Sequence, residues 1–307
     1  MLSVLIPVYN VDVRLMVREL HRQLVEANIY FEIIVLDDAS TKPVQELNGE
    51  LSALSCLRYS LLEQNIGRHR IRFVLAQKAL YPQLLFIDCD SLVCNGNFVA
   101  NYLEKIKPGS VIVGGRSYSD VAPQSRALRL HWKYGRHREQ RKALQRNLDP
   151  YLSFMTCNFV IPHSVMLRTF PGFYLTGYGH EDTLLGLQLL QSGVPVLHID
   201  NPLQHEGLQS GKTFLEHNQS ALKNLIALQD RLPHLTSLLD QKVKLLRTYK
   251  RIGLAKRVLP RGQFWIKLFR NLTLTTNSLF FLDVYKILSY HRLKRSEPVN
   301  SPVAATT

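Results

Sequence analysis

The sequence has few cysteines and no long apolar run. Its four cysteines show no Cys-x-x-Cys spacing, so neither a zinc site nor a disulfide scaffold is indicated, and a reduced cytoplasmic setting fits best. No window offers roughly 20 uninterrupted apolar residues, so we expect any membrane contact to be peripheral. The apolar run at residues 2–6 lacks a basic n-region and a cleavage site, which indicates a buried strand rather than a secretion signal.

Two nucleotide-binding motifs and a balance of charge are also missing. There is no Gly-x-Gly-x-x-Gly fingerprint and no Walker lysine motif, which disfavours dinucleotide-dependent enzymes and P-loop ATPases. Acidic residues number 24 against 38 lysines and arginines, a net charge of +14. This excess indicates polyanionic partners, which can be nucleic acid, nucleotide phosphates or an anionic membrane surface. Composition does not choose among the three.

The apolar content of 46% in 307 residues is enough for one large domain or two small ones. Four short apolar runs in the first two hundred residues are typical of strands buried on both faces: Val4–Val8, Phe31–Leu36, Leu84–Ile87 and Ser110–Val113. Helical patterns lie between them, for example at residues 15–24 and 71–79. This alternation predicts a mostly parallel sheet flanked by helices, with ligands at the carboxyl ends of the strands.

Polar motifs follow three of the predicted strands, namely Val8-Tyr9-Asn10, Asp37-Asp38-Ala39-Ser40 and Asp88-Cys89-Asp90. Because side chains at i and i+2 of an extended segment point to the same side, Asp88 and Asp90 can face one divalent cation and the phosphate it carries. The same spacing also occurs in solvated turns. Asp38 or Ser40 can instead cap a helix, which leaves Asp37 as the better ligand candidate of its motif.

A basic segment, Asn65–Arg72, opens a predicted helix with one glycine and three arginines. Positive charge combined with helix N–H groups suits a diphosphate. A solvated helix face is the alternative interpretation of the same run.

A second acidic pair, Glu181 and Asp182, occupies the first turn of a predicted helix after a glycine-rich loop. One carboxylate can accept a proton from a hydroxyl while the other hydrogen-bonds the incoming molecule, and favourable pairing with the helix dipole is the structural alternative. Farther along, His205 lies in a predicted loop. It is a candidate metal ligand because of the carboxylates upstream, although a structural histidine fits the same position.

Taken together, these motifs resemble the family 2 glycosyltransferases, which are inverting enzymes that use nucleotide-diphosphate sugars. The resemblance covers about residues 1 to 210 and rests on five segments in the family's order: Leu5–Asn10, Val35–Ser40, Gln64–Arg68, Phe86–Asp90 and Gly177–Asp182. It implies an α/β fold of the GT-A type, Rossmann-like, with a mostly parallel central sheet flanked by helices, here followed by a helical C-terminal extension.

The resemblance also implies roles for individual residues. Pro7, Tyr9 and Asp37 are expected around uracil or another base. Asp88 is expected at the ribose or the metal, and Asp90 is expected to bind Mn²⁺ or Mg²⁺ directly, with His205 completing the metal sphere. Asp182 matches the family's general base, with Glu181 beside it. The rest of the expected donor site is Asn10, Asn65, Gly67, Arg68 and Arg72.

The sequence departs from the family at three places. Where Ala-Arg-Asn is usual it reads Ile71-Arg72-Phe73, so only Arg72 carries over. Met155–Asn158 replaces a glycine-rich stretch, and Asn158 is a candidate acceptor contact. The Gln-x-x-Arg-Trp motif of processive synthases is missing, so we expect a single addition rather than polymerisation.

The expected domains are a GT-A domain at 1–210, a helical basic extension at 211–295 and a disordered tail at 296–307. Ser119–Pro150 reads as a basic amphipathic helix or pair. By the resemblance it contributes, with Trp132, to acceptor selection, and a solvated face is the alternative. The basic and aromatic stretch Tyr249–Arg295 suits an anionic membrane interface.

The expected function is metal-dependent transfer from a nucleotide-diphosphate sugar, first of all a UDP-sugar, to a hydroxyl of a glycan or lipid-linked acceptor, as in polysaccharide biosynthesis. The expected location is the cytoplasm or the inner face of the membrane. A sugar-phosphate nucleotidyltransferase is disfavoured because Pro7–Asn10 is not its Gly-x-Gly-x-Arg loop. A basic nucleic-acid-binding protein would not explain the two acidic pairs, so no nucleic-acid partner is expected.

Overall fold

The chain forms two compact units in the computed structural model, which describes residues 1–169, 175, 177–253 and 263–295. The first unit consists of Met1–Ser119, Glu139–Tyr174 and Leu185–Gly207, and the second of Asp120–Arg138, Leu175–Leu184 and Leu208–Thr307. The glycine-rich loop and the acidic pair at residues 177–182 therefore belong to the same unit as the C-terminal helices. The tail at 296–307, expected to be disordered, lies outside the described residues.

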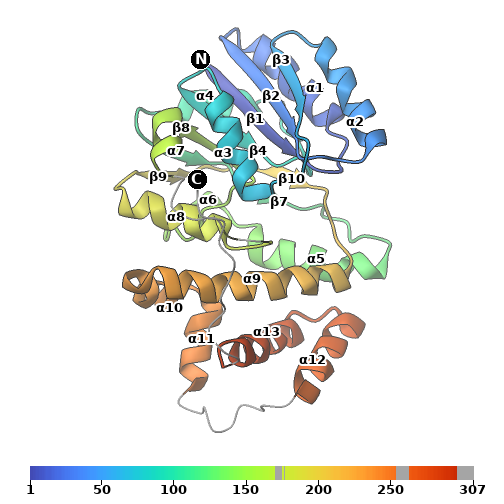
Figure 1. Cartoon of the computed structure of the whole chain (residues 1–307), viewed down its shortest axis with the longest axis vertical. Helices are drawn as coiled ribbons and strands as arrows, with labels where there is room; N and C mark the ends of the chain where they lie inside the picture. Colours follow the sequence, from blue (N-terminus) through green and yellow to red (C-terminus); the bar gives the residue numbers. More distant parts are fainter. Residues whose placement is uncertain (170–174, 176, 254–262, 296–307) are drawn as a thin grey trace. The chain divides into compact units, whose positions relative to one another are not determined.

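A seven-stranded sheet forms the centre of the first unit (Figure 1). Its strands, in spatial order, are β3 (Leu57–Leu61), β2 (Phe31–Asp37), β1 (Leu2–Val8), β4 (Gln83–Ile87), β8 (Asn158–Pro162), β6 (Val111–Val113) and β9 (Val196–His198). Neighbours are parallel except that β8 runs antiparallel to both β4 and β6. The mostly parallel sheet predicted from the four apolar runs is confirmed.

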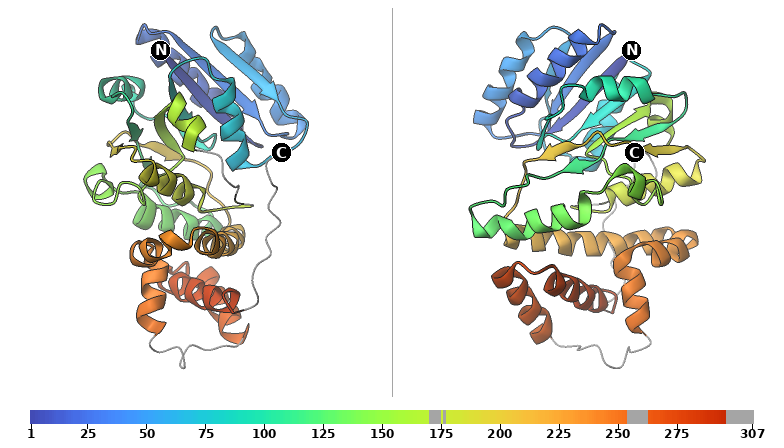
Figure 2. Two further views of the ribbon diagram at one scale, coloured as in Figure 1. Left: turned by 60° about the vertical axis from the view of Figure 1, so that its left-hand side comes forward. Right: turned by 180° about the vertical axis from the view of Figure 1, so that it is seen from behind.

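Helices cover both faces of this sheet (Figure 2). On one face, Val4 and Ile6 of β1 share an apolar cluster with α1 (Arg14–Glu26) and α4 (Phe98–Lys105). On the other, Leu5 packs with α3 (Arg68–Lys78), α7 (His163–Thr169) and the later part of α8 (Glu181–Gln191). Alternate side chains of β1 thus serve opposite clusters, and each fully buried one stabilises the fold by about 1.5–3 kcal/mol. The short α2 (Lys42–Gly49) follows β2.

A second, three-stranded sheet lies in the same unit. Its central strand β10 (Leu203–His205) pairs antiparallel with β5 (Ser91–Leu92) and parallel with β7 (Arg116–Ser117). The expectation that His205 lies in a loop was wrong, because His205 is the last residue of β10. Its register opposite Ser91 brings it beside Asp90, the residue that precedes β5.

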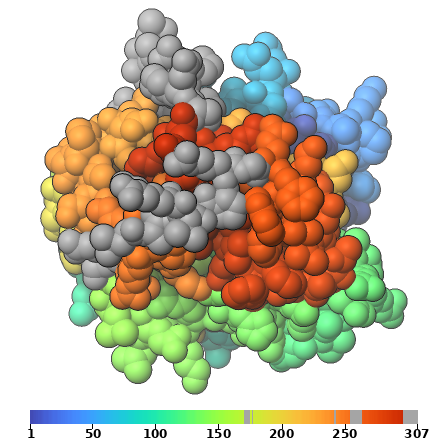
Figure 3. Space-filling model, turned by 90° about the horizontal axis from the view of Figure 1, so that it is seen from below, coloured from blue at the N-terminus to red at the C-terminus, as the bar shows by residue number. Residues whose placement is uncertain are grey.

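The second unit is helical. Its longest helix is α9 (Gly211–Arg231), against which α5 (Arg129–Tyr134) and α13 (Leu279–Leu293) pack around Leu130, Phe214 and Tyr285. The remaining helices are α10 (Thr236–Lys242), α11 (Lys244–Gly253) and α12 (Gln263–Thr276), and Figure 3 shows their surface in orange and red. Within the part of the chain that is described, no helix is both long enough and apolar enough to cross a bilayer.

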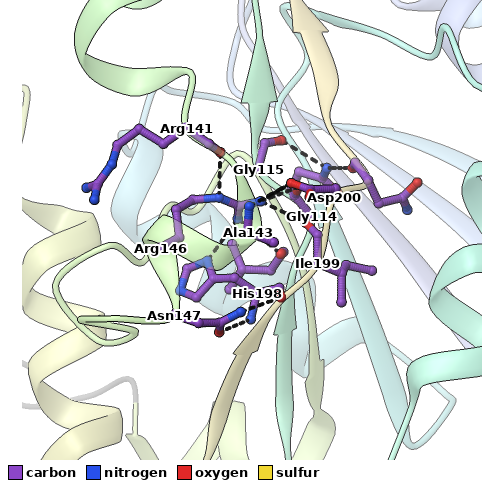
Figure 4. Close-up of polar contacts among 12 residues, drawn as sticks. Gly114, Gly115, Arg141, Ala143, Arg146, Asn147, His198, Ile199 and Asp200 are labelled. Carbon is purple, nitrogen blue, oxygen red and sulfur yellow. Dashed lines mark hydrogen bonds and ion pairs between the residues drawn. The ribbon is translucent and has the colours of Figure 1, made fainter.

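The basic stretch Ser119–Pro150 is broken into short pieces, among them α5, a π-helical turn (Gly135–Glu139) and α6 (Ala143–Arg146). Arg146 is buried, which corrects its reading as part of a solvated or acceptor-selecting face. Its guanidinium donates to the carbonyls of Val113, Gly114 and Ile199 at 3.3, 3.1 and 2.7 Å (Figure 4). A Cβ on Gly115, whose φ is +92°, would lie only 2.7 Å from this group. Arg146 therefore ties its segment to the ends of β6 and β9.

Candidate functional site

Asp90 and His205 form the centre of the candidate site, at the carboxyl end of β4. Asp90 Oδ1 lies 3.4 Å from His205 Nδ1, and the backbone N–H of Glu206 donates to the carbonyl of Asp90 at 2.8 Å. Burial by itself would raise the pKa of Asp90, but His205, Arg116 and Arg68 outweigh it and hold this pKa below its usual range. The backbone of Gly207 packs directly against Asp90, since a Cβ on Gly207 would lie 2.5 Å from Asp90 Oδ2.

These two side chains fit a divalent cation. Within the described residues, Asp90 Oδ1 is buried, and the 3.4 Å that separates it from His205 Nδ1 is longer than a well-formed hydrogen bond. A carboxylate and an imidazole are both ligands of Mn²⁺, and Mg²⁺ commonly binds one or two carboxylates together with substrate phosphates and water. No group of three or more His, Cys, Asp or Glu side chains in the described part of the chain can hold a metal ion. A cation here would need further oxygen atoms from a substrate or from water.

Asp88 is held by arginines. Arg72 donates to its Oδ1, Arg116 donates to its Oδ2 at 3.1 Å, and Arg68 lies 3.9 Å from Oδ2. The side chains of Asp88 and Arg72 are only 9% and 3% exposed, whereas that of Arg68 is 33% exposed. Asp88 is thus positioned to orient guanidinium groups. Its expected contact with ribose or metal stays a prediction.

Arg116 is the main site residue that the sequence reasoning missed. It begins β7 and lies between Asp88 and Glu139, whose Oε2 is 3.8 Å from Arg116 Nη1. The hydroxyl of Tyr118, two residues later, donates to the carboxylate of Glu139. The Tyr118 ring packs edge-on against the ring of His205, at 5.3 Å between centroids. The available signal was the pattern of an apolar run, Val111–Val113, followed by two glycines and an arginine.

The aspartates after β2 have structural partners. Asp37 is fully buried and accepts from the backbone N–H of Ser40 at 2.7 Å and from the hydroxyl of Tyr59 at 2.8 Å. A base could touch this carboxylate only if these neighbours moved. Asp38 does not cap a helix; it accepts from the N–H groups of Ile66 and Gly67, at 2.7 and 3.0 Å, and burial raises its pKa.

The loop that precedes α3 is therefore fixed by Asp38. Asn65 donates to the carbonyl of Asp38 at 3.1 Å, and Gly67 adopts a φ of +85° directly before the helix. A left-handed conformation of this kind favours glycine. The helix begins at Arg68, inside the segment Asn65–Arg72 that was predicted to open it, so Arg68 lies at its N-terminus, where anions are favoured.

The segment after β1 offers accessible groups. Tyr9 is 52% exposed, and Pro7, the penultimate residue of β1, is half-buried. Asn10 has a φ of +54° and is held by Ser40 and Thr41: its N–H donates to Ser40 Oγ, and its Oδ1 accepts from the N–H of Thr41, both at 2.8 Å. An exposed aromatic ring beside a fixed backbone suits stacking on a base, so the predicted role of Tyr9 has an open surface.

The acidic pair belongs to the second unit. Glu181 and Asp182 start α8, and Glu181 is buried while Asp182 is half-exposed. Burial and the charge of Lys286 lower the pKa of the neighbouring His180 to about 4, so this histidine is neutral at physiological pH. Asp182 is the more accessible of the two carboxylates.

Helix α9 holds the loop in front of this pair. Ser220 Oγ accepts from the N–H of Tyr178 at 2.9 Å, and the amide of Asn224 donates to the carbonyl of Gly179 at 2.8 Å. Tyr178 stacks on His217 of α9 at 4.2 Å between centroids. Gly179 has a φ of +96°, and a Cβ there would lie 2.5 Å from the Cβ of Ala221.

The two acceptor candidates differ in environment. Asn158 is fully buried, donates to the carbonyls of Gly115 and Asn201 at 3.2 and 2.8 Å, and accepts from the hydroxyl of Tyr102 at 2.5 Å. Its assignment as an acceptor contact was wrong, since a fully buried side chain with these partners cannot meet an external molecule. Trp132, on α5, is half-buried near Arg136, and its role stays a prediction.

Known proteins share this fold. Mannosyltransferase PcManGT from Pyrobaculum calidifontis, in complex with GDP-Man and Mn²⁺, has a TM-score of 0.60 at 14% identity over 96% of this chain and 88% of its own. TarS 1-349 from S. aureus has a TM-score of 0.50 at 16% identity over 96% and 92%. Glucosyl-3-phosphoglycerate synthase from Mycobacterium tuberculosis, with Mg²⁺ and UDP, has 0.51 at 16% over 75% and 79%.

Comparison with curated proteins finds no match to this chain. The sequence model of Glycosyl transferase family 2, however, matches residues 3–165, more than half of the chain. The matched range includes Asp37, Asp88 and Asp90, whose surroundings are described above. The chain is therefore a member of glycosyltransferase family 2, with a GT-A fold.

Proposed function

We propose that this chain transfers one sugar from a nucleotide-diphosphate donor to a hydroxyl of a glycan or lipid-linked acceptor, with inversion at the anomeric carbon and with a divalent cation. The pairing of Asp90 with His205 carries the proposal, because a carboxylate and an imidazole meet at the carboxyl end of β4. A cation bound there would supply charge stabilisation to the departing diphosphate. Asp90 and His205 would hold it.

The arginines around Asp88 would bind the donor's diphosphate. Three guanidinium groups surround Asp88, and Glu139 is 3.8 Å from one of them. Asp90 is a further acidic neighbour of two of these arginines, and a cation bound there would offset its charge. Arg68 is the accessible member and would contact the phosphate oxygens. Arg72 and Arg116 are nearly buried and would act through Asp88, which fixes the position of the cluster.

Donor recognition beyond the diphosphate falls to the segment after β1 and the loop before α3. Tyr9 would stack on the base, beside Pro7, and Asn10 would hold the backbone in place. Gly67 and Asn65 would shape the entrance of the donor site. We expect a UDP-sugar first. GDP-sugars belong in the same test, since the similar structures hold either UDP or GDP-Man.

Asp182 would act as the general base. It would accept the proton of the acceptor hydroxyl as the oxygen attacks the anomeric carbon, and general-base assistance of this kind is worth about 10²- to 10⁴-fold. Its half-exposed position supports this role over Glu181, which is buried. Glu181, beside it, would orient Asp182. Trp132 would contribute to acceptor binding.

The test combines binding and turnover. The protein is incubated with Mn²⁺ and a panel of UDP-, GDP- and dTDP-sugars, and release of the nucleoside diphosphate is followed alongside calorimetric binding. Slow hydrolysis of one donor is expected. Asp90→Ala should lose both the metal-dependent binding and the hydrolysis, because it removes a proposed ligand of the cation.

Asp182→Asn is the matched variant, since it should bind the donor like the wild type while losing transfer to an added acceptor. Glu104→Gln, at an exposed carboxylate of α4, is the control and should change neither readout. Metal-independent nucleotide binding, or full turnover by Asp90→Ala, would contradict the proposal.

A further inference from the structure

A row of five aromatic rings joins α12 to α13 in the second unit. We call it the aromatic ridge; it consists of Phe264, Trp265, Phe269, Phe281 and Phe280. Successive ring centroids along this row are 5.5, 6.5, 6.0 and 5.6 Å apart. The ridge extends from the first turn of α12 to the first turn of α13.

The two ends of the ridge are exposed to solvent while its middle anchors it. Phe264 and Phe280 are 67% and 68% exposed, and Trp265 is 41% exposed. Phe269 packs instead against the apolar core around Leu282 and Tyr285. Exposed phenylalanines that form one row on an anchored helix pair are a feature of interaction surfaces, because burying them in the chain's own core would have been more favourable.

Positive charge accompanies the ridge. Residues 263–295 contain six lysines and arginines and one acidic residue, Asp283. Asp283 is itself paired with Arg138 at 2.9 Å and Lys244 at 3.2 Å. Lys267 is exposed and lies one helical turn after Phe264, so cation and ring share the outer face of α12.

We infer that the aromatic ridge docks on an anionic lipid bilayer surface. Aromatic side chains with a polar or basic face favour the boundary between headgroups and acyl chains, and each lysine or arginine near an anionic surface adds attraction. An apolar partner protein would not require the surrounding cations. The docking goes beyond sugar transfer and is independent of whether the donor and acceptor assignments are correct.

Only part of the basic stretch Tyr249–Arg295 is available for contact with a membrane. Lys250 forms an ion pair with Asp240 at 2.6 Å, so its positive charge is balanced within the second unit. Lys256, Arg257 and Arg261 lie outside the described residues. In α13, Lys286 lies over the ring of Tyr134 and Lys294 over the ring of Tyr290. The surface that remains is the ridge with Lys267 and Arg270 of α12.

The chain contains its own reporter, because its only tryptophans are Trp132 and Trp265. In a Trp132→Phe background, the full-length protein is titrated with vesicles of phosphatidylcholine mixed with phosphatidylglycerol, and separately with pure phosphatidylcholine. The expected result is a blue shift of Trp265 emission with the anionic vesicles, together with quenching by brominated acyl chains. Co-sedimentation gives the bound fraction.

Matched variants assign the effect to the ridge. Phe264→Ala combined with Phe280→Ala should weaken binding at least about tenfold, and Lys267→Ala about fivefold. Tyr30→Ala and Lys107→Ala alter an exposed ring and an exposed lysine of the first unit and should change nothing. Circular dichroism of each variant verifies folding.

Three outcomes would overturn the inference. The first is no shift with anionic vesicles, and the second is equal binding to pure phosphatidylcholine. The third is a shift without vesicles that grows with protein concentration, which would assign the ridge to contact with a second copy of the chain.

Discussion

Arg146 and His198 form a buried pair that only one protonation state of the histidine permits. A guanidinium can only donate, so His198 Nδ1, 2.8 Å from Arg146 Nη1, must accept. Nε2 lies 2.8 Å from the carbonyl of Pro150 and must therefore donate. Burial and the charges of Arg146 and Arg141 lower the pKa of His198 to about 4, in agreement with a neutral ring.

The lowered pKa values of His198 and His180 predict that the fold loses stability as the pH falls below about 6.5. His198 and His180 both have a pKa of about 4 in the folded chain, against about 6.5 when unfolded. Between these values the unfolded state binds more protons, so the free energy of unfolding falls as pH is lowered from about 6.5 towards 4, by up to about 3 kcal/mol per histidine. Urea unfolding across this range measures it. A His198→Gln variant with an unchanged pH slope would contradict the assignment.

Arg146 itself should be irreplaceable by lysine. An ammonium group cannot reach the four carbonyls and the imidazole to which the planar guanidinium donates, so several buried acceptors would lose their hydrogen bonds. We expect Arg146→Lys to lower the free energy of unfolding by about 3 kcal/mol. Arg18→Lys, at a side chain 60% exposed, should change it by less than about 0.5 kcal/mol. Equal effects of the two changes would refute this role.

Single residues also show where reasoning from sequence stops. The Asp88-x-Asp90 spacing correctly identified a polar strand end. It could not show that Asp88 is held by arginines while Asp90 meets a histidine, since those partners come from distant segments. Asn158 was wrongly assigned for the same reason, because burial depends on neighbours that the local sequence does not contain.

At the scale of elements, α9 links the C-terminal extension to the acidic pair. Ser220 and Asn224 hold the backbone of the loop at residues 178–179, which leads directly into Glu181 and Asp182. The extension from residue 211 was predicted to be helical, and α9 agrees with that. That prediction gave no sign that the polar side chains between the apolar ones fix a loop far upstream.

Weakening this attachment should slow catalysis without affecting the donor. Asn224→Ala removes the hydrogen bond to the carbonyl of Gly179, and a small displacement of Asp182 should lower kcat by about tenfold to a hundredfold. Donor binding should stay at the wild-type level, because the proposed donor residues belong to the first unit. Steady-state kinetics and calorimetry measure the two effects.

The matched control is Gln219→Ala on the same helix, since Gln219 donates to the hydroxyl of Tyr285 on α13 rather than to the loop. It should retain kcat. If both variants lose the same fraction of activity, or if Asn224→Ala weakens donor binding as well, α9 has only a general structural role.

At the scale of the whole molecule, ligand binding should stabilise the chain through the first unit. Mn²⁺ with UDP at about a hundred times Kd should add about 2.7 kcal/mol of stability and raise the unfolding midpoint by about 5 to 10 °C. Asp90→Ala should abolish the Mn²⁺-dependent part of this shift, whereas Asp182→Asn should retain it. Scanning calorimetry with and without chelator tests both. A shift that survives chelation would show that the nucleotide binds without the cation.

The sequence by itself determined four of the seven strands of the central sheet, its mostly parallel architecture and the order of the family's motifs. These depend on local periodicity, because apolar runs and strand-end carboxylates are short-range patterns. Only the tertiary structure decided which carboxylates face which partners. The β5–β10 pairing joins Asp90 to His205, β7 adds Arg116, and α9 fixes the loop before Asp182. Contacts between residues distant in sequence arise from packing and register, which no local pattern encodes.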